Sequence, residues 1–375
     1  MKTQRLLAGL ALLALTACSR TQAPGPVQFF AEGMPASLAE WNLVYVADGR
    51  LRLNDRVEPY DLTTPLFTDY AHKLRTVWMP EGTTAHYEAE AAFDFPVGTI
   101  ISKTFYYPKG KGDAVLRSID HGPGADGGLA MDAVRLIETR LLVRREDGWL
   151  ALPYVWNAAQ TEARLMRGGE LVALTLVDAE GGSEQFDYVV PDQNQCAGCH
   201  GTDLASKAVF PIGPKARHLN RDFAYADGVS NQLAHWQQVG YLTGLPDGPK
   251  PKAPAWNDVA APLDARARAY LDINCGHCHS PNGAAKTSGM WLDAANDDPL
   301  RLGRCKLPIA AGQGTGDRAW GIAPGKPDDS ILLYRMESVD PAVMMPELGR
   351  SLSHEEGVAL VRDWIASMPE HDCGK

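Results

Sequence analysis

The sequence predicts a multidomain protein in which an N-terminal all-β, sandwich-like domain precedes a mostly α-helical region. Alternating apolar residues separated by tight-turn signals recur up to residue 191. A proline-rich segment then interrupts the chain at residues 245–254, and apolar residues at helical spacing follow it. At 375 residues, the chain has room for two to three domains of ordinary size.

Residues 28–191 contain three candidate hairpins. Residues 43–53 alternate around Asp48-Gly49, which is a strong two-residue turn signal. Residues 139–155 repeat this pattern around Asp147-Gly148, and residues 171–190 turn at Gly181-Gly182. The β-branched and aromatic run at 98–107 adds a further strand. Strands at this spacing predict a sandwich or jelly-roll-like domain.

The N-terminus is typical of an export signal. Lys2 and Arg5 precede the apolar run 6–15, which is too short to span a bilayer, and small residues follow. The order Leu-Thr-Ala-Cys that ends at Cys18 resembles the lipobox of bacterial lipoproteins. That resemblance implies a signal peptide over 1–18, a lipid on Cys18 and a tether over 19–27.

We therefore expect a protein anchored in the lipid bilayer on the periplasmic side of a bacterial membrane. The sequence fits the inner and the outer membrane equally. An ordinary secretory signal cut after Ala17 is the alternative. The net charge of −10 argues against nucleic acid as a partner and favours either solubility or a basic redox partner.

Two pentapeptides carry the chemistry. Residues 196–200 read Cys-Ala-Gly-Cys-His and residues 275–279 read Cys-Gly-His-Cys-His. Cys-x-x-Cys-His is the attachment signature of c-type haem, because two thiols one helical turn apart reach the two vinyl groups and the histidine then ligates the iron. Two other uses of paired cysteines fit less well. A thioredoxin-like redox pair needs a βαβ context, which this sequence lacks, and a zinc ribbon places its two cysteine pairs about 15–20 residues apart, much closer than the pairs are here.

The motifs thus predict two covalently bound haem c groups, each with its iron. Cys196, Cys199, Cys275 and Cys278 bind the porphyrins, and His200 and His279 are axial ligands.

The last 120 residues, 256–375, predict a second haem domain. Asp264 is expected to cap a helix leading into the motif, and Ser353-His-Glu-Glu356 reads as a capping box for a closing helix. With Met344-Met345-Pro346 between them, the arrangement resembles a class I cytochrome c domain. The resemblance implies that Met345 is the sixth iron ligand, with Met344 as its rival, whereas Met290 and Met336 are expected to be core residues.

The first haem segment, with the proline-rich linker, covers 192–255 and leaves its sixth ligand open. His218 and His235 are both candidates. A lone histidine is more often structural, so a ligand from the β domain (Met131, Met166 or His121) and an open coordination position remain alternatives.

Seven cysteines fit these assignments. With Cys18 assigned to lipid and four thiols to haem, Cys305 and Cys373 remain, and export favours disulfides. We predict that they are bridged, which would contribute about 4 kcal/mol in the chain-entropy picture. Two free thiols too far apart to bond are the alternative.

The chain as a whole resembles a bacterial family of di-haem c-type cytochrome lipoproteins with an N-terminal β domain. The similarity rests on residues 65–73, 95–103 and 212–220 and on both haem motifs. It implies di-haem electron transfer and assigns no role to the β domain. Its polar residues near aromatic runs are expected to form a solvated strand face or a salt bridge; these are Asp69, His72, Lys73 and Lys103.

The favoured function is electron transfer between redox partner proteins, a donor and an acceptor that the sequence does not identify. Two alternatives differ in class. One is a peroxidase-like enzyme whose first haem keeps an open position, and the other is a cytochrome subunit of a dehydrogenase complex. No nucleophile elbow, nucleotide-binding loop or two-histidine metal motif occurs in the sequence.

Overall fold

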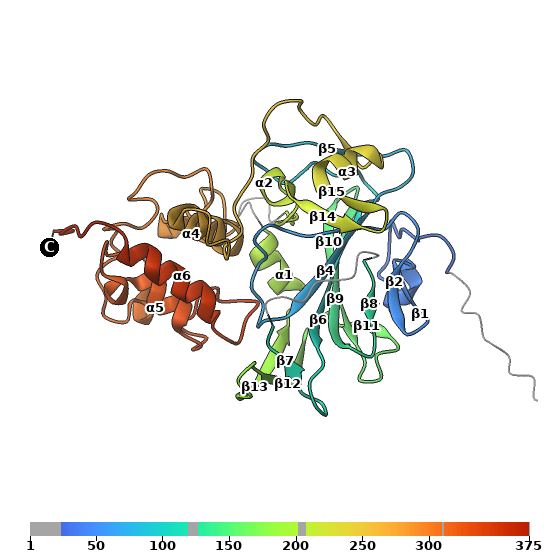
Figure 1. Ribbon diagram of the computed structural model, residues 1–375, viewed down its shortest axis with the longest axis horizontal. Helices are drawn as coiled ribbons and strands as arrows, with labels where there is room; N and C mark the ends of the chain where they lie inside the picture. The colour runs from blue at the N-terminus through green and yellow to red at the C-terminus, as the bar shows by residue number, and fades with distance from the viewer. Residues whose placement is uncertain (1–23, 119–126, 202–207, 310, 375) are drawn as a thin grey trace, which may run out of the picture.

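The computed structural model describes residues 24–118, 127–201, 208–309 and 311–374 (Figure 1). Cys18, predicted to accept a lipid, and His121, an alternative iron ligand in the sequence-based prediction, lie outside these residues. In the described part of the chain, no helix combines the length and apolar character needed to cross a membrane.

The largest sheet has six antiparallel strands in the order β11-β10-β9-β6-β4-β3. Its strands are β3 (Glu58–Tyr60), β4 (His72–Trp78), β6 (Ile100–Pro108), β9 (Val134–Arg145), β10 (Gly148–Trp156) and β11 (Ala163–Leu165). The predicted hairpin of β9 and β10 is confirmed, since Arg145 pairs with Gly148. The predicted strand at 98–107 is confirmed as β6.

Two three-stranded sheets flank the large one. Their strands are β1 (Val44–Ala47), β2 (Arg50–Leu53) and β8 (Leu129–Ala130), and β7 (Val115–Leu116), β12 (Glu170–Val177) and β13 (Ser183–Val190). Both remaining predicted hairpins are confirmed, and Asp48-Gly49 makes its turn with positive φ at both residues, as a type I′ turn requires. Phe105 and Tyr107 of β6 pack against Leu174 and Tyr188 of the second sheet.

Two small pairs complete the strands: β14 with β15, and β5 with β16. Their bounds are β5 (Ala85–His86), β14 (Asp222–Tyr225), β15 (Gly228–Asn231) and β16 (Leu242–Thr243). The parallel pairing of β16 with β5 attaches the segment after the first motif to the N-terminal half.

The helices are short. They are α1 (Gln193–His200), α2 (Ala216–Leu219), α3 (Gln232–Gln238), α4 (Leu263–Leu271), α5 (Ile331–Glu337) and α6 (Glu355–Ala366), with the single turns η1 (Leu38–Trp41), η2 (Asp272–Gly276), η3 (Lys286–Ser288), η4 (Gly312–Thr315) and η5 (Pro327–Asp329). Figure 1 shows α4, α5 and α6 at the end of the molecule that carries the C-terminus, with α1 between them and the sheets.

The predicted mostly α-helical cytochrome c-type region is wrong. Strands take up 28% of the structure and helices only 20%, in short pieces. Residues 277–309 and 311–330 are rich in glycine and proline and form loops and single turns, because both residues break helices. Residues 192–255 contain β14, β15 and β16 besides their helices.

Both predicted caps are also misplaced. Helix α4 begins after Pro262, and the Asp264 carboxylate instead accepts a hydrogen bond from the indole of Trp364 at 2.7 Å. Helix α6 begins after His354, and the hydroxyl of Ser353 donates to the carbonyl of Met336. These contacts to distant residues displaced the local caps that the sequence suggested.

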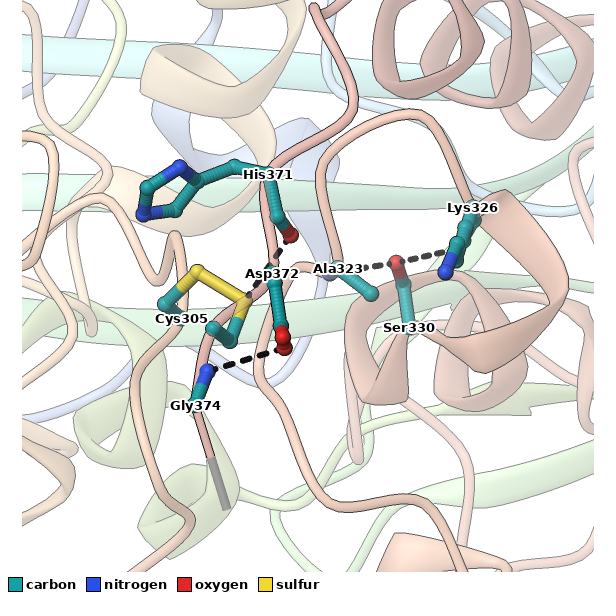
Figure 2. Close-up of a disulfide and its surroundings, with 8 residues drawn as sticks. Cys305, Ala323, Lys326, Ser330, His371, Asp372 and Gly374 are labelled. Carbon is teal, nitrogen blue, oxygen red and sulfur yellow. Dashed lines mark hydrogen bonds between the residues drawn. A yellow bond between two sulfur atoms is a disulfide. The ribbon is translucent and has the colours of Figure 1, made fainter.

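The predicted disulfide is confirmed (Figure 2). Cys305 and Cys373 are bonded, and their Cα atoms lie 5.1 Å apart, inside the range that a disulfide requires. The bridge attaches the chain end beyond α6 to the loop that precedes α5.

Candidate functional site

The two cysteine motifs lie side by side. The first forms the end of α1, and the second begins in η2, which continues from α4. The Sγ atom of Cys278 lies 3.9 Å from the carbonyl oxygen of Gly198, and Cys199 and Cys278 line the same cavity. The fold therefore brings together two motifs that are far apart in the sequence.

The second motif faces a cavity of about 310 Å³. Cys275, Cys278 and His279 line it together with Met345. Its other walls are largely apolar and include Leu292, Leu307, Ile309, Ile331, Leu332 and Leu348. A cavity of this size with a few polar groups in an apolar wall is typical of cofactor sites.

Hydrogen bonds orient the imidazole of His279. The hydroxyl of Ser288 donates its proton to the carbonyl of Ala285 at 2.7 Å, so it can only accept from Nδ1–H of His279, at 3.3 Å. Nε2 then carries the free lone pair. Burial lowers the pKa of His279 to about 4, which keeps the ring neutral, as metal ligation requires.

Met345 reaches the same cavity as His279. Its backbone N–H donates to the carbonyl of Arg335 at 2.8 Å, and its carbonyl accepts from the guanidinium of Arg350 at 3.0 Å. Its rival Met344 is buried and does not line the cavity.

Two further methionines contribute to the cavity wall. Met336 belongs to the apolar core between α4, α5 and α6. Met290 follows Ser288 and packs on Gly303, where an added Cβ would lie 2.7 Å from its methyl group. Met290 therefore belongs to the loop that holds His279, whereas Met336 and Met345 both come from the other side of the site.

The first motif faces a cavity of about 140 Å³ against the six-stranded sheet. Cys196, Cys199 and His200 line it. Nδ1 of His200 lies 2.7 Å from the carbonyl oxygen of Phe210, which can only accept, so Nδ1 is protonated and Nε2 is free. Burial lowers the pKa of His200 to about 4. Both motif histidines thus have the tautomer and charge of an iron ligand.

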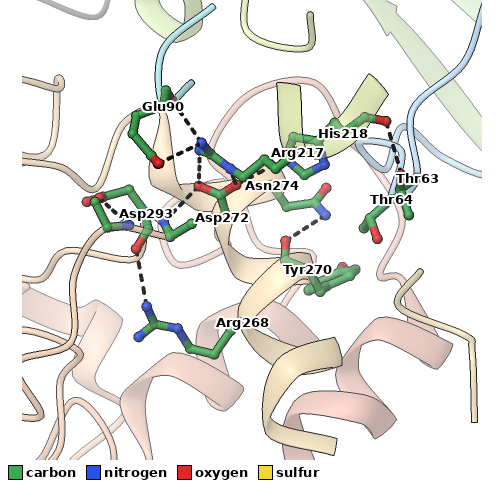
Figure 3. Close-up of polar contacts among 12 residues, drawn as sticks. Thr63, Thr64, Glu90, Arg217, His218, Arg268, Tyr270, Asp272, Asn274 and Asp293 are labelled. Atoms are coloured by element: carbon green, nitrogen blue, oxygen red, sulfur yellow. Dashed lines mark hydrogen bonds and ion pairs between the residues drawn. The ribbon is translucent and has the colours of Figure 1, made fainter. Parts of the chain in front are cut away.

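His218 does not line this cavity and lies instead beside Arg217 and Asp272 (Figure 3). Its Nε2 lies 3.0 Å from Asp272, whose carboxylate also binds Arg217 through two nitrogens, at 2.7 and 3.0 Å. Burial raises the pKa of Asp272, but hydrogen bonds from His218 and Arg217 outweigh this and hold it below its usual range. His218 therefore donates its Nε2–H to the Asp272 carboxylate and does not line the cavity of the first motif.

His235 is also engaged elsewhere. Its Nε2 lies 2.9 Å from the carboxylate of Glu58, and its ring stacks on Tyr225 with centroids 3.5 Å apart. Met131 and Met166 pack against two cores of the β-sheets. None of the three lines the cavity of the first motif.

The four polar residues near aromatic runs have separate roles. Asp69 is buried and accepts backbone N–H groups of Ser351 and Leu352 at 2.8 and 2.7 Å, while burial raises its pKa to about 6. Lys73 donates to the carbonyl of Ala71, and the ring of His72 lies against Tyr106. Asp69 therefore ties the N-terminal half to the loop before α6.

Lys103 lines the cavity of the first motif, together with Arg75 and Arg140. Burial and then the charges of Arg140 and Arg75 lower the pKa of Lys103 to about 7. The sequence contained one signal for this group, because Arg75, Lys103 and Arg140 each sit within a run of apolar residues that reads as a buried strand. His277, between the second pair of cysteines, lines both cavities and was also missed.

The residues of both cavities fit a covalently attached haem. Each cavity is lined by the two thiols of its own motif, a neutral imidazole with a free Nε2 and many apolar side chains. The cavities adjoin, since Cys199, Asn274, His277, Pro346 and Leu348 line both.

The chain matches no protein-family model, no curated protein and no solved structure.

Proposed function

We propose that the chain is a di-haem c-type cytochrome that transfers electrons between redox partner proteins. One observation carries this proposal. Two Cys-x-x-Cys-His motifs meet at adjoining cavities, and the histidine of each has Nδ1 bound to an acceptor and Nε2 free. Bound haem supplies one-electron redox chemistry.

The chain's own residues have distinct roles. Cys196 and Cys199 hold the first haem, and Cys275 and Cys278 hold the second. His200 and His279 are the proximal ligands, each held in place by its Nδ1 hydrogen bond.

Met345 is the sixth ligand of the second haem. A thioether at this position raises the reduction potential and fills the coordination sphere, which suits electron transfer over catalysis. The hydrogen bonds of its backbone to Arg335 and Arg350 hold Met345 at the cavity wall.

The proximity of Cys199 and Cys278 supports a relay. The two cysteines line one cavity and would each hold a different haem, so electrons could pass between the two haems within the protein. The chain would act on the periplasmic side of a bacterial membrane, anchored through a lipid on Cys18.

An alternative is favoured by the first cavity. Among the described residues that line it, His277, Lys103 and Tyr60 are side chains besides His200 and the thiols that could offer iron a lone pair. With none of these three bound, the first iron would keep an open position, as a peroxidase-like enzyme needs.

A reduced-minus-oxidised spectrum of the haem-loaded protein, repeated with carbon monoxide, tests the proposal. Carbon monoxide binds ferrous haem where the sixth position is empty or weakly held. If the protein is an electron carrier, carbon monoxide should shift the spectrum of neither haem. Binding of one full haem equivalent would favour the enzyme and make peroxide the next substrate to test.

A further inference from the structure

We propose that Arg75, Lys103 and Arg140 bind the propionate carboxylates of the first haem, so that the six-stranded sheet is one wall of that haem's site. This inference rests on the proposed function. It assigns a role to the N-terminal β-sheets.

The three cations form one row across the sheet. Arg75 of β4 pairs directly with Lys103 of β6, and Lys103 pairs directly with Arg140 of β9. Direct cross-strand partners point to the same face, and all three side chains line the cavity of the first motif. The row therefore faces Cys196, Cys199 and His200.

The three cations of the row have fewer carboxylate partners than positive charges. Arg140 binds Glu138 with Nε at 2.8 Å from the carboxylate, and Arg75 binds Asp61 through Nη1 at 2.5 Å. Lys103 has no carboxylate partner among the described residues, and its ammonium lies 5.2 Å from the ring centre of Phe105.

A second donor in the row also lacks a partner. The Arg75 side chain is 4% exposed, and its Nη2 is buried without a hydrogen bond. Like charges directly across a sheet repel, and buried donors without acceptors are costly. An anion with carboxylate oxygens between Arg75 and Lys103 would satisfy both groups.

The rest of this wall suits a porphyrin. Ile101, Leu142 and Ala151 form an apolar row across β6, β9 and β10, two residues along the strands from the cations. Haem has the same division, with an apolar ring that carries two propionates on one edge. The vinyl edge, opposite the propionates, is the one that Cys196 and Cys199 would hold.

The test is a potentiometric titration of the full-length, haem-loaded protein carrying Lys103→Met. The first haem is identified as the redox wave lost in the Cys196→Ser/Cys199→Ser variant. Without Lys103, the propionates are less neutralised and the oxidised iron is favoured. The equilibrium constant for reduction of the first haem should therefore fall by about tenfold.

Lys109→Met is the matched control, because Lys109 lies just beyond the end of β6 on the exposed surface. It removes the same charge and should leave both waves unchanged. Lys103→Arg should restore the wild-type wave. If Lys103→Met does not yield folded protein, Lys103→Gln makes the same charge change and should show the same shift.

Acetate added to the oxidised proteins distinguishes the two sources of a carboxylate. If the propionates already occupy the row, replacing Lys103 should not change the binding of acetate. An unshifted first wave in Lys103→Met, or acetate binding that Lys103→Met abolishes, would overturn the inference. A wild-type protein without covalent haem would instead overturn the proposed function.

Discussion

Replacing Asp272 with asparagine should strongly destabilise the protein. Asp272 is 2% exposed and accepts hydrogen bonds from Arg217, His218 and the backbone N–H of Ala294. The amide keeps the volume but leaves Arg217 buried without its counter-charge (Figure 3). Breaking a buried ion pair on one side typically costs about 3–5 kcal/mol, so we expect a loss of that size in the free energy of unfolding.

Guanidinium-induced unfolding followed by tryptophan fluorescence measures the effect. Asp328→Asn is the matched control, because Asp328 forms an exposed ion pair with Arg362 at 2.7 Å. Exposed pairs are worth about 0–1 kcal/mol, so the control should unfold close to the wild type. Equal midpoints for the two variants would refute the buried network as a stabilising element.

Three further predictions concern the second haem, the disulfide and pH. Met345→Ala should make the second haem bind carbon monoxide and lower its potential, whereas Met344→Ala should do neither; a silent Met345→Ala would remove it as the ligand. Joint replacement of Cys305 and Cys373 by serine should lower the unfolding free energy by up to about 4 kcal/mol in guanidinium titrations, and an unchanged midpoint would contradict this. The pKa of Asp69 rises from 3.8 to about 6 on folding, so its stabilising effect is complete below pH 3.8 and is lost as pH rises to 6. The Asp69→Asn variant keeps the acceptor for Ser351 and Leu352 but does not titrate. The unfolding free energy of this variant relative to wild type should therefore rise by about 3 kcal/mol between pH 3.8 and 6, and curves of unfolding free energy against pH that run parallel for the two proteins would refute this.

The hairpins could be predicted because their signals are local. Asp48-Gly49 fixes a two-residue turn by its own backbone preference, and the alternating strands on either side fix the pairing. The two Cys-x-x-Cys-His motifs are local in the same sense, since α1 alone places Cys196, Cys199 and His200. The disulfide followed from counting cysteines.

Features that depend on distant contacts were missed. Whether a buried histidine faces a cavity or a carboxylate depends on residues such as Asp272, 54 positions from His218, and Glu58, 177 positions from His235. The sequence analysis overestimated the amount of helix. Apolar residues at helical spacing correctly indicated α4 and α6, but the long segment between these helices consists mostly of loops.

The cation row could not be predicted for the same reason. Arg75, Lys103 and Arg140 lie on three strands, and they become neighbours only through the register of the sheet.

Haem stoichiometry tests the central claim most directly. The full-length chain, produced with a c-type haem maturation system, should show by intact mass and by haem absorbance two haems per chain, retained after denaturation. Cys196→Ser/Cys199→Ser and Cys275→Ser/Cys278→Ser should each retain one, and the combined variant none. A wild-type chain that matures without covalent haem, or variants that retain both haems, would contradict the account.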